Sequence, residues 1–308
     1  MNSPIAILSS WLREHYRQFA EVSTLDLIVR LTMIFLLVKP MNLWYLQVPV
    51  TLLCILGLAS PRAGRSPVVW FLLAYFLLAR VVIFWDVVDN HIYLLGYWAL
   101  ALACALALAE SRTAISVSAH LLLGLAFLFS VLWKGVLSPD FVSGEFFRYT
   151  LLSDRRFHDF VLLFGALSPQ EYASNQGELR QLARTGEPIT LIESARLVLL
   201  AQISTWWTLV HEAFIAVAFL GKRVAWLSKV RHAALVSFAW ITYPFATVVG
   251  FGWLLMILGI AQCEPELKRT RLLYLATLLV IFVHQFVPWT TALTETVTAG
   301  WSPTNPPS

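Results

Sequence analysis

The sequence predicts an all-α protein, a polytopic transmembrane helix bundle of about eight spans, within a range of about seven to nine. Of the 308 residues, 58% are hydrophobic and 13% are charged, whereas a soluble domain carries roughly 25% charged residues. Apolar stretches close to the length of about 20 residues that a spanning helix needs recur along the chain. The net charge of +4 sits mostly in short connections between them, which is the usual orientation signal of a bilayer protein.

The first segment, residues 1–24, is expected to form an amphipathic helix at the membrane interface. Charged residues within it, and the lack of a small-residue cleavage site before an apolar core, argue against a cleaved signal peptide. Its apolar residues recur at helical spacing: Ile5, Leu8, Leu12, Tyr16 and Phe19.

Residues 25–290 are expected to form the membrane domain. A polar connection from Ser138 to Arg156 follows its first group of spans, and a short apolar piece, Phe157–Leu167, comes next. The most hydrophilic internal stretch, Ser168–Pro188, is expected to be a loop outside the bilayer. The first five spans are predicted as follows: Leu25–Val38, Leu43–Ala59, Pro67–Trp85, His91–Ala109 and Ala114–Val136.

The second half of the chain is predicted to be helical again. Ile189–Leu220 would reach near 48 Å as one helix, so it is expected to begin at the interface and then enter the bilayer. His232–Ala261 is expected to be a broken helix near Tyr243–Gly252, because Pro and Gly interrupt it there. Leu272–Val287 closes the bundle, and residues 291–308 are expected to be a flexible, Pro-rich tail.

Basic residues set the expected orientation. Arg13 and Arg17, Arg62 and Arg65, and Arg112 alternate with connections that are poor in Lys and Arg. Because basic connections stay on the cytoplasmic side, the N-terminus is predicted to be cytoplasmic.

Several function classes are disfavoured by the same composition. No basic and aromatic face exists outside the spans, so nucleic acid is not an expected partner. The three cysteines, Cys54, Cys104 and Cys263, fit no zinc or redox spacing, and no metal site is predicted. The expected partner is the lipid bilayer itself.

Two titratable residues lie at the ends of long apolar stretches, where such groups are costly and often functional. His91 can accept a proton near neutral pH; the alternative is that it caps a helix at the headgroup level. A partly desolvated Lys134 can lose its charge and act as a base; the alternative is that its long stem carries the ammonium to the interface. Counting spans places both residues toward the outer face.

A polar stripe is predicted along the helix within Ile189–Leu220. It faces a cavity, another helix or the membrane interface, because it is unsuited to lipid. Arg30 and Arg80 are expected to pair with an acidic residue, namely Asp86, Glu193 or Glu212. The stripe consists of Glu193, Arg196, Ser204, Thr208 and His211.

Three segments resemble a known family. Asp89-Asn90-His91-Ile92-Tyr93-Leu94-Leu95-Gly96 resembles the Asn-Asn-His-x-Tyr-Leu motif of vitamin K-dependent gamma-carboxylases and of related bacterial proteins with the horizontally transferred transmembrane (HTTM) domain. Lys134, followed by Ser138-Pro139-Asp140-Phe141, is similar to the family's apolar helix that ends in Lys and then Asn-Pro-Asp-Trp. The late run from Tyr243-Pro244 to Trp253-Leu254-Leu255 is similar to bacterial members.

The resemblance implies a quinone or hydroquinone cofactor and assigns roles. Lys134 would be the catalytic base that deprotonates the hydroquinone, and His91 its catalytic partner. The expected cofactor contacts are Asn90 and Tyr93 of the motif, Trp133 beside the lysine, and His211 on the polar stripe.

Three functions follow as expectations. The first is a quinol-dependent, carboxylase- or oxidoreductase-like enzyme of a bacterial inner membrane. The second is a maturation or export factor for a secreted peptide, working with other membrane proteins. The third is a non-catalytic subunit that binds lipid or quinone. The large extracytoplasmic domain of the carboxylases has no counterpart in this sequence, which points to the short bacterial type.

Overall fold

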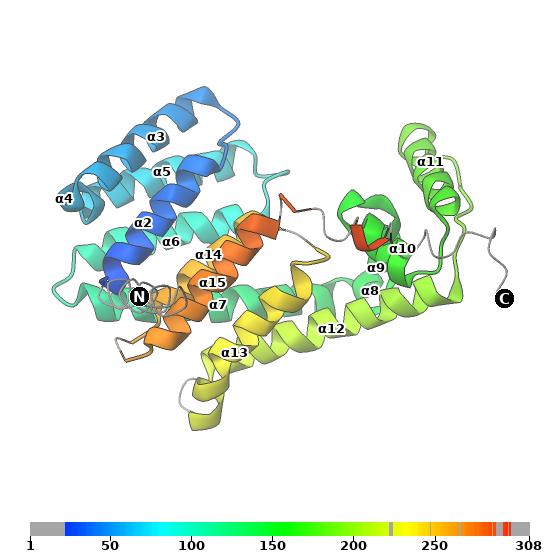
Figure 1. Ribbon diagram of the computed structural model, residues 1–308. Helices are drawn as coiled ribbons and strands as arrows, with labels where there is room; N and C mark the ends of the chain where they lie inside the picture. The colour runs from blue at the N-terminus through cyan, green and yellow to red at the C-terminus, as the bar shows by residue number, and fades with distance from the viewer. Residues whose placement is uncertain are drawn as a thin grey trace, which may run out of the picture. The chain divides into compact units, whose positions relative to one another are not determined.

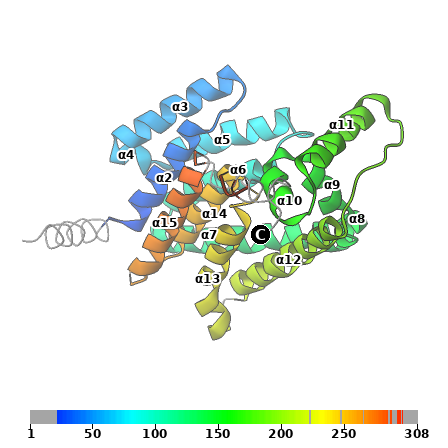
Figure 2. The same ribbon diagram turned by 45° about the vertical axis from the view of Figure 1, so that its right-hand side comes forward.

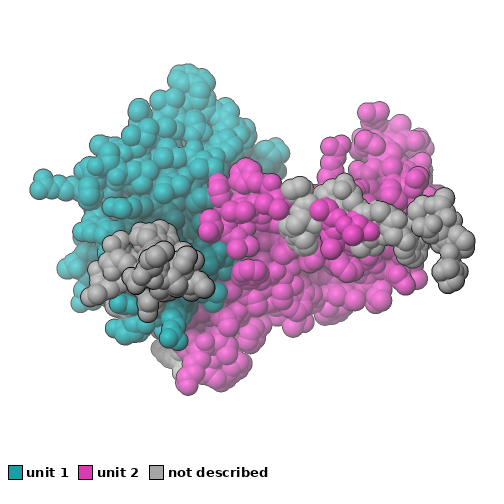
Figure 3. Space-filling model, viewed as in Figure 1, with its two compact units in different colours: residues 1–123, 253–278 teal, residues 124–252, 279–308 magenta. Residues whose placement is uncertain are grey.

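In the computed structural model, all regular secondary structure among the described residues is helical, and no strand occurs among them. These residues are 22–221, 224–246, 248–264, 266–284, 286–287, 292–294 and 296. The predicted all-α class is therefore confirmed. The chain divides into two compact units, residues 1–123 with 253–278 and residues 124–252 with 279–308 (Figure 3).

Unit 1 is built mainly from consecutive helices that pack on one another. α5 and α6 pack together extensively, and α2 packs against α3 (Figure 1). Most of α14 and α15 and the first half of α7 complete the unit. The helices are α2 (Thr24–Val38), α3 (Trp44–Ala59), α4 (Pro61–Gly64), α5 (Pro67–Ile83), α6 (Asn90–Leu106), α7 (Ser111–Leu132), α14 (Val249–Ala261) and α15 (Lys268–His284).

Buried polar donors tie the core of unit 1 together. Trp98 is fully buried, and its Nε1 donates to Thr32 Oγ1 at 3.1 Å. Trp70 Nε1 donates to the Gly64 carbonyl at 2.8 Å. A Cβ added at Gly57 would lie only 2.5 Å from Met33 Sδ, so α2 and α3 need glycine there for their close approach. Because each of these buried indole N–H groups has an acceptor, its burial leaves no unsatisfied donor in the apolar core.

Unit 2 contains two long helices and a group of short ones. α12 packs against α13, and α8, α9 and α10 pack near the start of α12 (Figure 2). The last half of α7 leads into this unit and ends in a π-helical turn. Its further elements are η1 (Trp133–Leu137), α8 (Pro139–Val142), α9 (Glu145–Ser153), η2 (Arg155–Phe157), α10 (His158–Phe164), α11 (Pro169–Thr185), α12 (Ala195–Leu220) and α13 (Ala225–Thr242).

Residues 138–194, here called the polar cap, fold around a small core of their own. Leu151, Leu152 and Val161 are fully buried, and the core continues into Leu197 and Ala201 at the start of α12. The buried Asn175 amide bridges to the backbone of Ile192, donating to its carbonyl at 2.8 Å and accepting from its N–H at 2.7 Å. The extended stretch before α12 is thereby fixed against α11.

The expectation of a loop over Ser168–Pro188 is wrong, because most of this stretch is helix α11. Ser168 and Glu171 form a capping box, in which each side chain satisfies a backbone N–H of the other residue. Pro169 starts the helix, and Gly186 ends it with φ of 70°. Hydrophilic composition predicted exposure, but the caps at both ends specify a helix.

Helices lie where the sequence predicted spans, but among the residues that the structure describes two helices are long and apolar enough to cross a bilayer. These are the continuous helix Ser111–Leu137, with 27 residues, and Ala195–Leu220, with 26. α3, α5, α6 and α14 are apolar but have 10–17 residues each. A bundle of about eight spans is therefore not confirmed and stays a prediction.

The expected broken helix is observed as two helices. α13 ends at Thr242, directly before Tyr243-Pro244, and α14 begins at Val249. The Gly250-Phe251-Gly252 run does not break a helix; it lies inside α14. A Cβ at Gly252 would lie 2.6 Å from the Tyr243 ring, so this glycine makes room for that ring against the α14 backbone.

The exposed face of α12 is as apolar as its buried face. Leu199, Ile203, Val210 and Val217 are each more than half exposed, with fractions of 58%, 56%, 64% and 55%. They recur at helical spacing along one side. A surface helix of a soluble protein places polar side chains at such positions.

The expected domain division stays a prediction. Residues 1–21 of the amphipathic segment lie outside the described part of the chain, as does the tail 291–308 apart from 292–294 and 296.

Candidate functional site

Lys134 and Glu212 form a close ion pair within unit 2. Lys134 lies in the π-helical turn η1 that ends the long apolar helix, and Glu212 lies in α12. Lys134 Nζ donates to Glu212 Oε1 at 2.6 Å. The Lys134 side chain is 24% exposed and the Glu212 side chain 7%, so the contact is largely removed from solvent.

The second carboxylate oxygen of this pair lies inside the protein. Glu212 Oε2 is buried and has no hydrogen-bond partner among the described residues. On the other side of the pair, Lys134 Nζ lies 5.5 Å from the centre of the Phe141 ring, a cation–π distance. A buried carboxylate oxygen without a donor is costly, and it is an acceptor into which a ligand O–H or N–H could donate.

The local backbone around Lys134 is unusual. The helix changes from α to π geometry over Trp133–Leu137, and Ser138-Pro139 then starts α8. Proline disfavours helix at the residue before it, so the chain is forced to turn there. π-helical turns are rare and recur at functional sites.

The contact with Glu212 changes the expected role of Lys134. An ammonium and a carboxylate at this distance attract each other strongly where water is largely excluded. The resemblance implies a neutral lysine base, whereas the pair offers a fixed positive charge and a carboxylate as the acceptor. Any proton transfer at this site therefore involves both residues.

His211 neighbours Glu212 in sequence but packs against α13. Its Nε2 lies 3.1 Å from the Ala234 carbonyl and 3.2 Å from Ser237 Oγ. Its ring packs edge-on against Trp207 and Phe238, and Nδ1 is buried without a partner in the described part of the chain. These contacts favour the packing interpretation of the polar stripe.

The other end of that stripe is also engaged in structure. Glu193 pairs with Arg148, which also pairs with Glu145. The expectation that Arg30 or Arg80 would take Glu193 or Glu212 as a partner is wrong, because Arg148 and Lys134 hold those carboxylates. Arg80 donates instead to the Pro40 carbonyl at 2.9 Å.

His91 lies in unit 1, in the first turn of α6, and contacts a lysine that the sequence did not single out. Lys39 Nζ lies 2.6 Å from His91 Nε2, and Asp89 Oδ2 lies 3.9 Å from the same nitrogen. Lys39 follows the last residue of α2. Burial, and secondly the positive charge of Arg80, lower the pKa of Lys39 to about 8. Two groups that both bind protons thus share one short contact.

The remaining expected cofactor residues belong to different compact units, Asn90 and Tyr93 to unit 1 and Trp133 to unit 2. Asn90 is exposed at the start of α6, and Tyr93 is half-buried one turn later. Trp133 is 66% exposed beside Lys134. His91 and Lys134 belong to different compact units, and each has its own partner, so a shared site of the two stays a prediction.

A signal for Glu212 was present in the sequence. Lys134 is the single charged residue between Arg112 and Asp140, and Glu212 is the single acidic residue of α12. Lone charges of opposite sign on long apolar helices are expected to pair. Lys39 carried no such signal, because a basic residue at a helix end is ordinary.

No group of three or more His, Cys, Asp and Glu side chains suited to a metal ion occurs among residues 22–296 that the structure describes. Comparisons with protein-family models, with curated proteins and with solved structures found no match for this chain.

Proposed function

We propose that this chain is a multi-pass membrane protein whose Lys134–Glu212 pair handles a proton of a quinol-type ligand. The proposal rests on one observation: Lys134 and Glu212, which stand in long apolar helices, meet at 2.6 Å, and one buried carboxylate oxygen is left without a donor among the described residues. The resemblance to gamma-carboxylase-like proteins of bacterial membranes supplies the ligand class.

Membrane insertion is supported by the surfaces of the helices. Two helices are long and apolar enough to span. The exposed side of α12 carries Leu199, Ile203, Val210 and Val217 in place of polar residues. An apolar surface of this extent is stable against lipid and a liability in water.

The residues present fit a hydroxyl-bearing aromatic ligand. A hydroquinone supplies an ionisable O–H. Glu212 Oε2 is the acceptor that would take its hydrogen bond and then hold its proton. Lys134 Nζ, fixed by Oε1 of the same carboxylate, places positive charge beside the oxygen that loses the proton. Phe141 offers an aromatic face 5.5 Å from Nζ.

The energetic case depends on burial. In a low-dielectric site a fixed ammonium stabilises a developing negative charge far more than it would in water. General acid–base groups contribute typically 10²- to 10⁴-fold to a rate. The pair can therefore matter to catalysis although both groups are charged at rest.

A second candidate is a non-catalytic membrane subunit. What favours it is that Lys134 and Glu212 already satisfy each other, as two charges in a purely structural contact do. In that case, loss of the pair lowers folding yield and leaves every reaction untouched.

The test is quinol binding and turnover by the full chain in detergent, with vitamin K hydroquinone as the probe. Glu212→Gln keeps the shape of the side chain and an acceptor but removes its charge, and Lys134→Met removes the cation. The exposed Lys229 of α13 provides the matched control Lys229→Met. We expect oxygen-dependent loss of the hydroquinone to fall at least about 100-fold in the first two variants and to be unchanged in the control.

A readout separate from turnover is the amount of quinone retained after gel filtration. Glu212→Gln is expected to retain less quinone while eluting at the wild-type position. Wild-type turnover and retention in both folded variants would sink the proposal and leave the non-catalytic role.

A further inference from the structure

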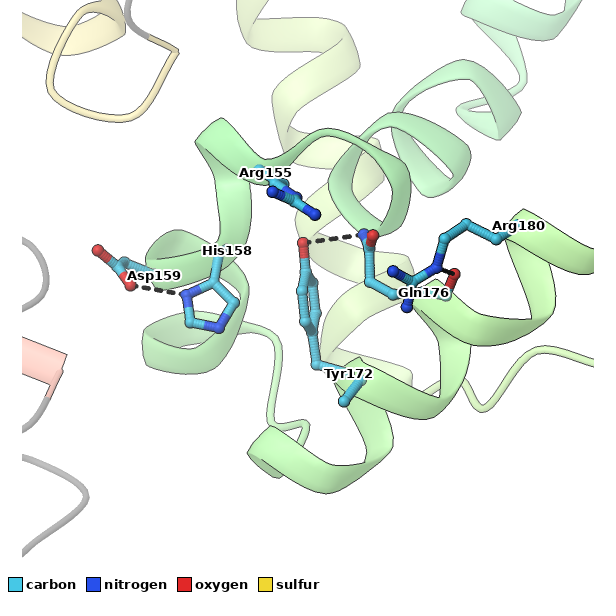
Figure 4. A pocket seen from close by; sticks show the side chains of 7 residues that line it. Arg155, His158, Asp159, Tyr172, Gln176 and Arg180 are labelled. Carbon is cyan, nitrogen blue, oxygen red and sulfur yellow. Dashed lines mark hydrogen bonds and ion pairs between the residues drawn. The ribbon is translucent and has the colours of Figure 1, made fainter.

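The polar cap contains a pocket of about 500 Å³, outside both long apolar helices (Figure 4). This volume lies in the range of roughly 300–1,000 Å³ that is usual for small-molecule sites. One wall comes from α11 and the other from η2 and the start of α10. Neither Lys134 nor Glu212 lines this pocket.

The wall from α11 presents three donors at helical spacing. Tyr172, Gln176 and Arg180 are four residues apart and share one face of the helix. Arg180 Nε donates to the Gln176 carbonyl at 3.0 Å, which orients the guanidinium. Its terminal nitrogens have no partner among the described residues.

Gln176 and Tyr172 are fixed to each other. Gln176 Nε2 donates to the Tyr172 hydroxyl oxygen at 3.3 Å and also to the Leu152 carbonyl. The hydroxyl therefore accepts from the amide and keeps its own proton to donate. Burial raises the pKa of Tyr172, so this proton stays in place at neutral pH.

The opposite wall adds a cation that is not neutralised. The Arg156 guanidinium forms an ion pair with the Asp154 carboxylate. The side chain of its neighbour Arg155 has no ion pair or hydrogen bond among the described residues, and Figure 4 shows it extending toward the Tyr172 hydroxyl. Of these two adjacent arginines, Arg156 forms an ion pair with Asp154, whereas Arg155 lines the pocket.

The single acidic residue of the lining is itself bound. Asp159 Oδ1 lies 2.8 Å from His158 Nδ1, and the His158 ring packs edge-on to Tyr172 with centroids 4.9 Å apart. The carboxylate is thereby directed to His158, and the lining also contains the guanidinium groups of Arg155 and Arg180.

We propose that this pocket binds a phosphate-bearing anion through Arg155, Arg180 and the Tyr172 hydroxyl. Two guanidinium groups and a hydroxyl supply more donors than one carboxylate needs, and they match the three free oxygens of a phosphate ester. Tyr172 and His158 give the rest of the ligand an aromatic wall.

Two sources of that phosphate are compatible with the position of the cap. The cap follows Ser111–Leu137 and precedes Ala195–Leu220, the two helices long enough to span, so both of its ends adjoin apolar helix ends. A lipid headgroup and a soluble phosphate ester share the chemistry, and two binding measurements distinguish them.

The soluble source is tested by calorimetric titration of the full chain in neutral detergent with inorganic phosphate and with glycerol 3-phosphate. The lipid source is tested by native mass spectrometry, which compares retained phosphatidylglycerol with diacylglycerol of the same acyl chains. The phosphate is the only feature that the first lipid shares with the soluble probes and the second lacks.

Arg155→Gln and Arg180→Gln are each expected to weaken phosphate binding by about tenfold or more, because each removes a charge-assisted contact. The matched control is Arg184→Gln: Arg184 is exposed, lies on α11 one turn beyond Arg180 and does not line the pocket. Its replacement is expected to change binding by less than about twofold. Tyr172→Phe keeps the buried ring and removes the donor, with an expected loss of about threefold.

If Arg155→Gln and Arg180→Gln weaken the binding of the soluble phosphates in the calorimetric titration, the ligand is a soluble ester. If they lower the amount of retained phosphatidylglycerol in the mass spectra, the ligand is a lipid headgroup. Circular dichroism and elution position report whether each variant is folded. The proposal is overturned if wild type binds no probe in either arm. It is equally overturned if Arg184→Gln weakens binding as much as Arg155→Gln and Arg180→Gln, since binding would then follow overall charge.

Discussion

In each compact unit a lysine makes a 2.6 Å contact with another titratable side chain, and the two contacts have opposite electrostatic character. In unit 2, Lys134 meets the carboxylate of Glu212 at 2.6 Å. In unit 1, Lys39 meets the imidazole of His91 at the same distance. A carboxylate stabilises the charged lysine, whereas an imidazole, with Arg80 nearby, disfavours it. The same residue type is thus a fixed cation in one unit and a group with weakened basicity in the other.

This difference matters for assigning chemistry. The resemblance places the base at Lys134, but it is at Lys39, beside the histidine of the motif, that burial lowers the pKa of a lysine. Lysines act as bases when they lose their charge near the working pH. We therefore interpret Lys134 as the lysine that supplies charge and Lys39 as the one suited to accept a proton, and each can be tested alone.

The largest expected effect is that of breaking the opposite-charge pair. Glu212→Ala leaves the mostly buried Lys134 ammonium without its carboxylate, and the free energy of unfolding is expected to fall by about 3 kcal/mol. Detergent-resistant unfolding, followed by circular dichroism during SDS titration, measures it. The double variant Lys134→Met/Glu212→Leu is expected to recover most of this loss, because two apolar side chains need no partner.

The outcome that contradicts this prediction is an equal loss in the single and double variants. Packing at the contact, and not the pairing of charges, would then account for the stability. The exposed Lys229 provides a control, since Lys229→Met is expected to change the unfolding free energy by no more than about 0.5 kcal/mol.

A smaller effect of opposite sign is expected for the other contact. The pKa of Lys39 is lowered to about 8 in the folded protein, against about 10.4 in an unfolded chain. Between these values the unfolded chain binds a proton that the folded chain lacks, so wild-type stability rises with pH across this window. Lys39→Met removes the penalty and is expected to stabilise the protein at pH 7 by about 1 kcal/mol, after allowance for the partial exposure of Lys39.

The pH dependence distinguishes this cause from simple gain of apolar surface. The advantage of Lys39→Met over wild type is expected at pH 7 and should vanish near pH 10, measured as thermal unfolding midpoints in detergent. Lys268→Met, at an exposed lysine of α15, should show no such change with pH. Destabilisation by Lys39→Met at both pH values would mean that the Lys39–His91 hydrogen bond is a net stabilising contact.

Sequence patterns located most helices but not these contacts. Apolar runs placed α2, α3, α5, α6, α7 and α15 within a few residues, since hydrophobic length and proline or glycine at the ends are local properties. Lys134 and His91 were recognised as unusual because each stands at the end of an apolar run. Their partners lie 78 and 52 residues away in sequence, and such pairings depend on how helices pack.

In the polar cap, the sequence composition predicted the wrong secondary structure. Its composition predicted a loop at Ser168–Pro188, yet the capping box of Ser168 and Glu171 specifies helix α11. That helix brings Tyr172, Gln176 and Arg180 to one face, opposite Arg155. The pocket could not be foreseen from the sequence, because it depends on a helix that composition alone argued against.

The smallest expected effect concerns another pair of opposite charges, Asp154 and Arg156, which is more exposed than the Lys134–Glu212 pair. Asp154 accepts from Arg156 Nε at 2.9 and 3.0 Å through its two oxygens and from the Arg156 N–H at 3.0 Å. The Arg156 side chain is 48% exposed, twice the value of Lys134 in its pair. Asp154→Asn is therefore expected to cost only about 0.5 kcal/mol, since solvent-exposed ion pairs are weak.

The pH dependence of this exposed pair has the opposite sign to that of Lys39. Hydrogen bonds from the Arg156 side chain lower the pKa of Asp154. Its contribution is therefore complete above the unfolded value of about 3.9 and is lost as the pH falls through the lower folded value. The difference between wild type and Asp154→Asn should be constant from pH 7 to 5 and disappear in strong acid, with the exposed Glu187→Gln as control. If Asp154→Asn instead lowers the free energy of unfolding as much as Glu212→Ala does, burial is not what distinguishes the two opposite-charge pairs. Lys134 and Glu212 would then be distinguished only by their position in apolar helices.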